Sequence, residues 1–229
     1  PNLKNLIIKN NNCSSYWPKT AGIRVYYASS PVLIQNVEIK DNIGGAIYTL
    51  TDSDKSVKIL NCEIHDNSTT NAASAIYIHR GQSSELTVEN TLIYNNISSG
   101  VLNVVQGANL VFLNSTLYNN NAGINLSGNS GIFNTIIGSN HTITNQGFLK
   151  VLNSLVQDGQ NSIINPVPAF LTYSNSISGN PIFVDVQQND LHLTEYSPAI
   201  GKGASTFSAY TISYNSPLAD IDGNMRPDP

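Results

Sequence analysis

The sequence predicts an all-β fold in which short parallel strands stack into a solenoid, the parallel β-helix, and three observations predict it. A motif N-x-x-[ILV]-x-x-[NG] recurs seven times at spacings of 19 to 31 residues. Alternating stretches such as GIRVY (22–26) and GAIYTL (45–50) lie between the motifs, and no segment shows sustained helical periodicity. Asparagine supplies 32 of the 229 residues, whereas only 11% of the residues are charged.

This composition is a consequence of the predicted fold. Coils of a β-helix stack about 4.8 Å apart, so equivalent side chains contact their counterparts above and below. Like charges in such a column repel, while asparagines can hydrogen-bond along it in a ladder. We expect the opening asparagine of each motif to stack in this way; these are Asn5, Asn36, Asn61, Asn90, Asn114, Asn134 and Asn153. The closing positions are Asn11, Asn42, Asn67, Asn96, Asn120, Asn140 and Gly159.

The chain divides into about seven recognisable coils over residues 1–159 and a less regular segment over residues 160–229. Seven of the ten prolines lie in the second segment. We expect this segment to add irregular C-terminal coils to the same solenoid and to cap its open end, with Phe170, Phe183 and Leu193 packed on the core. The N-terminal coil has no cap of its own, so we expect flanking domains of a longer chain.

The motif series resembles the right-handed parallel β-helix repeats of secreted bacterial proteins and polysaccharide lyases. The tail carries GNPIFVD (179–185), NDLHL (189–193), SPAIGKG (197–203) and DIDGNMRP (220–227). These motifs resemble the C-terminal signature of bacterial surface β-helix proteins that carry a choice-of-anchor domain. The resemblance implies a right-handed helix and export to the cell surface or medium, sometimes by type IX secretion. The strand similar to D-I-G-A-Y-E that usually follows in that group is absent here, so we expect the chain to be a truncated part of a longer protein.

Charge limits where chemistry can occur. The net charge of −4 disfavours nucleic-acid binding, and no apolar run of 18 residues is present to span a membrane. Residues 90–149 contain no Asp, Glu, Lys or Arg. Any active site is therefore expected in the early coils or in the tail. The two cysteines, Cys13 and Cys62, are not expected to form a disulfide, and we expect Cys62 to be an inert packing residue.

One strand face is predicted to present aromatic side chains. The alternation directs Ile23, Ile47, Ile76, Val101 and Ile124 inward. It directs outward Arg24, Tyr48, Tyr77, Leu102 and Asn125, then Tyr26, Leu50, His79 and Val104, with Arg80 at the edge. We expect a ligand-binding face for glycans, made of Arg24, Tyr26, Tyr48, Tyr77, His79 and Arg80, because aromatic rings suit sugar faces and arginine suits uronate or sulfate. The alternative is ordinary cross-strand stacking of aromatic residues.

A second face gathers ionisable groups. Glu38 is predicted to stack on Glu63, and Lys40 on His65, with Asp41 and Asp66 nearby. These residues could bind Ca²⁺ or act as the catalytic groups of a lyase, with Glu38, Glu63, His65 and Lys40 as the candidates. The alternative is a solvated set of surface ion pairs.

In the tail, Asp220 and Asp222 resemble the opening of a calcium loop. An Asx-stabilised turn is the favoured interpretation, because the downstream bidentate Glu of such a loop is missing. We expect Arg226 to pair with one of these carboxylates.

The leading functional hypothesis is a secreted or cell-surface module, not an enzyme, that presents a face to a polysaccharide or a surface protein. Two alternatives stay open: a polysaccharide lyase or related carbohydrate-active enzyme, and a passive spacer or cargo region of a larger exported protein.

Overall fold

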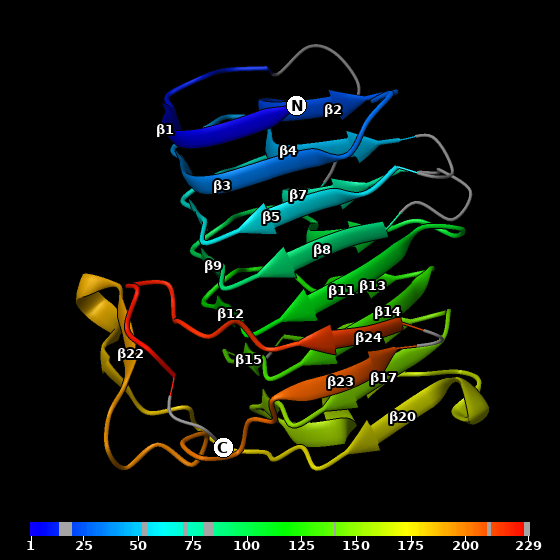
Figure 1. Ribbon diagram of the computed structural model, residues 1–229, viewed down its shortest axis with the longest axis vertical. Coiled ribbons are helices and arrows are strands. Elements are labelled where there is room, and N and C mark those ends of the chain that lie inside the picture. The colour runs from blue at the N-terminus through cyan, green and yellow to red at the C-terminus, as the bar shows by residue number, and fades with distance from the viewer. Residues whose placement is uncertain are drawn as a thin grey trace.

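The computed structural model describes residues 1–13, 20–51, 55–70, 73–79, 85–139, 141–209 and 212–226. The predicted stack of parallel strands is confirmed, because consecutive coils pair in register and every strand pair within the solenoid is parallel. Figure 1 shows the coils descending from β1 beside the N-terminus to β20 near the opposite end. The strands form three faces.

The first two faces share one 13-stranded sheet that bends along a line of asparagines, and the third face is a separate 7-stranded sheet. β1 (Asn2–Lys9) and β3 (Val32–Lys40) cross this line and contribute to both of the first two faces. The first face continues through β5 (Val57–Leu60), β8 (Glu85–Glu89), β11 (Asn109–Leu113), β14 (Asn129–Phe133), β17 (Leu149–Leu152) and β20 (Leu171–Ser174). The second face continues through β6 (Glu63–His65), β9 (Leu92–Tyr94), β12 (Thr116–Tyr118), β15 (Ile136–Ile137) and β18 (Leu155–Val156). The third comprises β2 (Thr20–Tyr26), β4 (Gly45–Leu50), β7 (Ala73–Ile78), β10 (Gly100–Val104), β13 (Ile124–Leu126), β16 (Ile143–Asn145) and β19 (Ile163–Ile164).

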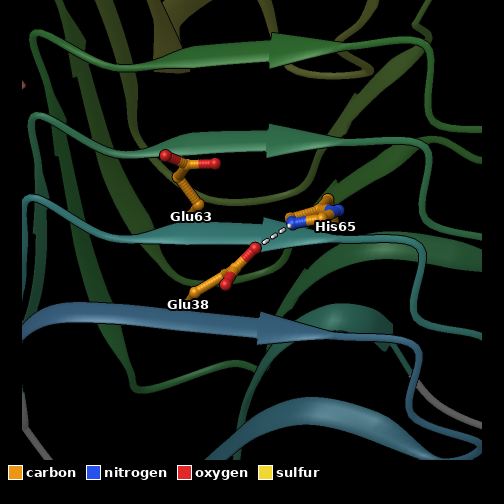
Figure 2. Close-up of side chains that lie close together, drawn as sticks. All are labelled: Glu38, Glu63 and His65. Atoms are coloured by element: carbon orange, nitrogen blue, oxygen red, sulfur yellow. Dashed lines mark hydrogen bonds and ion pairs between the residues drawn. The ribbon is translucent and has the colours of Figure 1, made fainter. Parts of the chain in front are cut away.

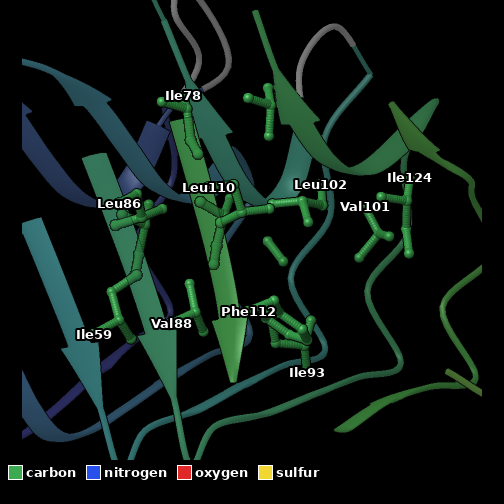
Figure 3. Packing of buried hydrophobic residues seen from close by; sticks show 14 of the residues in the cluster. Ile59, Ile78, Leu86, Val88, Ile93, Val101, Leu102, Leu110, Phe112 and Ile124 are labelled. Carbon is green, nitrogen blue, oxygen red and sulfur yellow. The ribbon is translucent and has the colours of Figure 1, made fainter. Parts of the chain in front are cut away.

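The core lies inside the coils and consists of columns of apolar side chains, to which each coil contributes one residue. Ile39, Ile64 and Ile93 stand in register along the second face and are fully buried. Figure 3 shows how Leu86, Leu110 and their neighbours from different faces fill the same interior. Because each coil covers the apolar surface of the next, burial is continuous along the axis and supplies the main stabilisation of the solenoid.

The opening asparagines of the motif produce the bend between the first two faces. All seven have a left-handed backbone, with φ between 47° and 55°. Asparagine tolerates this conformation better than other residues with a side chain, which explains its recurrence here. Asn175 has the same conformation (φ 50°) and continues the column into an eighth coil. The motif search missed it because Ser178 stands where an apolar residue was required.

The opening asparagines hydrogen-bond to each other in pairs, Asn36 to Asn5 (3.1 Å) and Asn134 to Asn114 (3.5 Å), but the continuous ladder runs through the closing asparagines. The Nδ2 group of Asn42 donates to Oδ1 of Asn67 (2.9 Å), Asn67 donates to Asn96 (3.0 Å), and Asn96 donates to Asn120 (2.9 Å). Asn11 begins the ladder by donating to Asn42. These side chains point inward, where each amide also binds a carbonyl of the adjacent coil. Asn140, the next closing position, lies outside the described residues.

We expected residues 160–229 to add irregular coils that cap the open end, but beyond residue 179 the tail takes a different course. It forms two antiparallel hairpins, β21 (Phe183–Asp185) with β22 (Asp190–Leu193) and β23 (Thr206–Ala209) with β24 (Ile212–Asn215). Both turn back along the side of the solenoid, where β23 and β24 lie against the first face (Figure 1). Three short 3₁₀ turns, Gly159–Ser162, Pro168–Phe170 and Val186–Gln188, link these parts.

The hairpins pack where the solenoid has apolar residues on its outer surface. Phe207 stacks on Phe133, with ring centroids 5.1 Å apart, beside the outward-facing Val111 and Leu113. Phe183 contacts Tyr118 edge to face at 4.9 Å, and Leu193 joins the same cluster. Phe170, expected to pack on the core, lies against Phe148 instead (4.3 Å). The tail therefore covers one side of the coils because that side would otherwise expose apolar surface.

The ladder predicts a large effect of Asn67→Ala. The substitution leaves the buried amide groups of Asn42 without their acceptor, so we expect the free energy of unfolding to fall by about 3 kcal/mol, measured by urea denaturation. Asn36→Gly is the matched control: it removes an exposed asparagine and preserves the left-handed backbone, and it should change stability by less than about 1 kcal/mol. Equal losses in both variants would contradict a special role for the ladder.

Candidate functional site

Adjacent coils bring the predicted ionisable residues together on the outer surface of the second face. The parallel register places Glu63 directly over Glu38 and His65 over Lys40. Tyr94 of the next coil stands over His65. All five side chains point outward because Ile39 and Ile64, which alternate with them, point into the core. We call Glu38, Glu63, His65 and their neighbours Lys40, Asp66 and Tyr94 the acidic–histidine cluster.

Direct contacts order this cluster, and Figure 2 shows the one between Glu38 and His65. Oε1 of Glu38 lies 2.6 Å from Nζ of Lys40 and 3.1 Å from Nε2 of His65. The other ring nitrogen of His65, Nδ1, lies 2.7 Å from Oδ2 of Asp66. Tyr94 stacks on the His65 ring, with centroids 4.6 Å apart, and its hydroxyl donates to Glu63 (3.3 Å). Both ring nitrogens and the lysine are therefore engaged with carboxylates.

Charge and burial shift the protonation equilibria of the cluster. The hydrogen bond from Lys40, aided by His65, lowers the pKa of Glu38 below its usual value, so this side chain is a carboxylate at neutral pH. Burial and the nearby carboxylate of Glu63 raise the pKa of Tyr94, so its hydroxyl keeps its proton and acts as a donor. The cluster has more carboxylates than cations, which favours binding of cations over binding of acidic saccharides.

The predicted aromatic face forms only in part. Tyr48 and Tyr77 stack with parallel rings 5.6 Å apart, His79 lies beside both, and the guanidinium of Arg24 lies over the rings of Tyr26 and Tyr48. The expectation that Tyr48 is presented to ligands is wrong, because only 1% of it is exposed. Its burial raises its pKa to about 12. Arg24 and Tyr26 are exposed, whereas Arg80 lies outside the described residues.

The inside–outside assignment was also wrong on this face for Leu50, Leu102 and Val104. Leu50 is buried. A register shift after Gly100 pairs Leu102 with Ile76 and Asn103 with Tyr77. Leu102 and Val104 consequently point into the core, and Asn103 takes the outward position. Asn125, predicted to point outward, donates to Asn103 (2.6 Å). The irregularity adds one residue to the coil, which a strict period of two does not anticipate.

A groove of about 810 Å³ lies between the second face and the tail. Its floor is part of the outward column of the second face, from Glu63 through Leu92 and Thr116 to Ile136. Its walls come from β22, from residues 199–205 and from residues 216–226. The tail motifs noted in the sequence thus build the walls. The expected sites were all based on charged or aromatic side chains, so this neutral groove was not among them. The sequence did carry one signal for it, because the column that begins with Glu38 and Glu63 continues with the uncharged Leu92 and Thr116.

Opening asparagines of the later coils hold the tail in place. The Nδ2 group of Asn90 donates to the carbonyl of Ala219 (2.8 Å), and its Oδ1 accepts from Arg226 (2.8 Å). Asn134 donates to the carbonyl of Ala204 (2.8 Å) and accepts from its backbone amide (2.9 Å). Asn153 donates to the carbonyl of Lys202. These asparagines therefore connect the coils to the tail. Arg226 donates to one of them, while Asp220, one of the two expected carboxylates, acts on it through its charge.

A histidine joins two parts of the groove wall. Nδ1 of His192 lies 2.5 Å from Asp190, and Nε2 lies 2.8 Å from Asp222. Hydrogen bonds to both carboxylates raise the pKa of His192, and the histidine in turn lowers the pKa of Asp190. Asp220 accepts from the backbone amides of Asp222 and Asn224, the pattern of an Asx turn. The two carboxylates proposed for Ca²⁺ are thus engaged in separate contacts.

The cysteines make no bond with each other. Both thiols are free, and Cys62 is buried. Burial raises the pKa of Cys62 to about 11, so the thiolate form that reacts with oxidants is scarce at neutral pH.

The family of the chain follows from comparison with known proteins. Residues 2–168 match the family described as "Right handed beta helix region", so the chain belongs to this family and its coils are right-handed. No curated protein and no solved structure is significantly similar to it. In the described part of the chain, no helix has the length and apolar character needed to cross a membrane.

The environments of His192 and His141 shift the pKa values of the two side chains in opposite directions. Proton NMR should give His192 a pKa above the usual 6.5, and Asp222→Asn should lower it. His141, which donates to the carbonyl of Gly138, should titrate below 6.5 because burial disfavours its charged form. The contact of His192 then stabilises the fold fully below pH 6.5, and this contribution is lost as pH rises through its raised pKa. The contribution of Asp190 is instead lost as pH falls through its lowered pKa. An unshifted His192 in the wild-type protein would contradict the contact.

Proposed function

We propose that this chain, a member of the right-handed β-helix family, is a non-catalytic secreted or cell-surface module that binds a neutral glycan in the groove beneath its tail. The observation that carries the proposal is the groove itself. Its volume of about 810 Å³ lies in the range of ligand sites, and it joins an apolar strip to many neutral hydrogen-bonding groups. Export is supported by the resemblance of the wall motifs to those of bacterial surface proteins.

The floor of the groove suits a saccharide chain. Leu92 and Ile136 offer apolar contacts to sugar C–H groups, while Thr116 between them offers a hydroxyl. Opening asparagines and the glycine-rich segment 199–205 line the groove side by side, since Asn134 hydrogen-bonds to Ala204 and Asn153 to Lys202. Because the coils repeat about every 4.8 Å, these groups recur along the groove, as a chain of repeating units requires.

The charges around the groove favour a neutral ligand. Leu92, Thr116 and Ile136 carry no charge, and Glu63 lies at the end of the groove beside the acidic–histidine cluster. In the walls, Asp190 and Asp222 contact His192, and Asp220, Lys202 and Arg226 add charges of both signs. The groove lining therefore mixes both signs and offers no row of cations of its own to an acidic polysaccharide, which leaves a neutral chain as the better match.

Ile200 provides the sharpest test of the groove. It lines the groove with 53% of its surface exposed, so the longer side chain of Ile200→Arg should extend into the groove without disturbing the core. We expect this variant to weaken binding of the preferred neutral oligosaccharide at least tenfold in isothermal titration, after a glycan array has identified it. Ile164→Arg, at a similarly exposed isoleucine on the third face, should bind like the wild type. Equal binding by both variants would contradict the groove as the site.

A polysaccharide lyase is the second candidate, favoured by the juxtaposition of Glu38, Glu63, His65 and Lys40. It is the weaker candidate because Lys40 and both nitrogens of His65 are already engaged with carboxylates. A lyase would form an unsaturated uronate product from acidic polysaccharides, detected by its ultraviolet absorbance. Such activity, lost in Lys40→Met, would replace the binding proposal. If the array and the lyase assay are both negative, the remaining hypothesis is the passive spacer.

A further inference from the structure

We propose that Glu38, Glu63 and His65 form a binding site for a divalent first-row transition-metal ion such as Zn²⁺. Each residue offers one ligand atom, and these atoms all lie within 4.8 Å of one another. Ligands of tetrahedral zinc lie about 2.0–2.2 Å from the ion, so small side-chain rotations bring the three atoms to bonding distance. The site meets one end of the groove at Glu63, and ion binding there does not depend on the proposed glycan binding.

The surroundings of His65 are those of a metal ligand rather than of an ordinary surface histidine. Only 7% of His65 is exposed, and its ring is fixed by the stacked ring of Tyr94. Asp66 Oδ2 lies at Nδ1, which directs Nε2 toward Glu38. Metal-binding histidines usually donate their other ring N–H to a carboxylate in this way, because the contact fixes the ring and increases its basicity.

The carboxylate ligands are supported as well. The Tyr94 hydroxyl donates to Oε2 of Glu63 and leaves Oε1 available. Asp66 has a left-handed backbone (φ 53°), and its carboxylate contacts the histidine that precedes it. Two of the three ligands thus have a partner that orients them before any ion binds. Glu38 and Glu63 also line a hollow of about 300 Å³ on the surface, so further coordination positions would face solvent.

The ligand set selects the class of ion. Ca²⁺ and Mg²⁺ prefer oxygen ligands only, whereas imidazole suits Zn²⁺, Cu²⁺ and Ni²⁺. One nitrogen with two carboxylates therefore favours a first-row transition metal over the Ca²⁺ considered from the sequence.

Lys40 is a built-in competitor for the ion. Its ammonium lies 2.6 Å from Glu38 and supplies positive charge that an ion would otherwise bring. Binding of the metal must displace this contact, after which Asp41, the next residue, is an alternative partner near Lys40. Removing Lys40 should consequently strengthen metal binding, an effect that loss of a purely structural lysine would not have.

Isothermal titration of the chelator-treated chain with ZnCl₂ tests the site. We expect one saturable site, at least 100-fold weaker binding in His65→Gln, and 10- to 100-fold weaker binding in Asp66→Asn. Lys40→Gln should bind Zn²⁺ at least threefold more tightly. Lys58→Gln is the matched control, because Lys58 forms an equally short ion pair with Glu89 on the neighbouring face and should leave affinity unchanged. Circular dichroism checks that each variant is folded.

Two further measurements distinguish the site from adsorption of ions. Co²⁺ should replace Zn²⁺ and give visible absorption bands that disappear in His65→Gln and persist in His192→Gln. Titration with CaCl₂ should show much weaker binding than titration with ZnCl₂. The proposal is overturned if Zn²⁺ does not saturate one site, if Ca²⁺ binds more tightly, if His192→Gln abolishes binding, or if Lys40→Gln and Lys58→Gln have equal effects. If the chain binds no glycan, the metal titrations still test this site, so failure of one proposal can be told from failure of the other.

Discussion

The structure depends on the register between successive coils. Each coil presents its backbone groups and side chains directly beneath the equivalent groups of the next, so a residue type that suits one position must also suit contact with itself. Isoleucine, leucine and valine meet this condition in the interior. The buried amides of Asn42, Asn67 and Asn96 meet it at a polar corner, since each can donate to one coil and accept from another. Charged side chains of one sign repel each other in such a column, which accounts for the rarity of charged residues.

The same register distributes the possible functions along the molecule. One outward column changes from Glu38 and Glu63 to Leu92, Thr116 and Ile136 as the coils proceed. The charged end can attract a cation, and the neutral end forms the floor of a groove. The asparagines that bend the sheet have a second use beside this column, because their side chains reach the tail. Local backbone geometry and the attachment of a distant segment are therefore served by the same residues.

The sequence was most informative wherever the repeat determines the neighbours. The parallel strands and the pairing of Glu38 with Glu63 and of Lys40 with His65 could be predicted because they follow from the spacing alone. The shift at Gly100 could not, since one additional residue reverses every later side chain in that strand. The burial of Tyr48 and the course of the tail depend on contacts between segments without a common period. A partial signal did exist: in NLVFL (109–113) the alternation is lost, which indicates a strand covered on both sides.

The folded-back tail changes how the solenoid can come apart. In an isolated stack, each coil contacts only its neighbours, so coils can fray one at a time from either end. Here the hydroxyl of Tyr214 donates to Glu85, and Asn90 donates to Ala219, two contacts that each span 129 positions in the chain. Further hydrogen bonds join the tail to the coils at Asn134 and Asn153. The later coils are thereby joined to the tail in one cooperative unit, and Tyr94 connects the acidic–histidine cluster to that unit through its contacts with His65, Phe183 and Leu191.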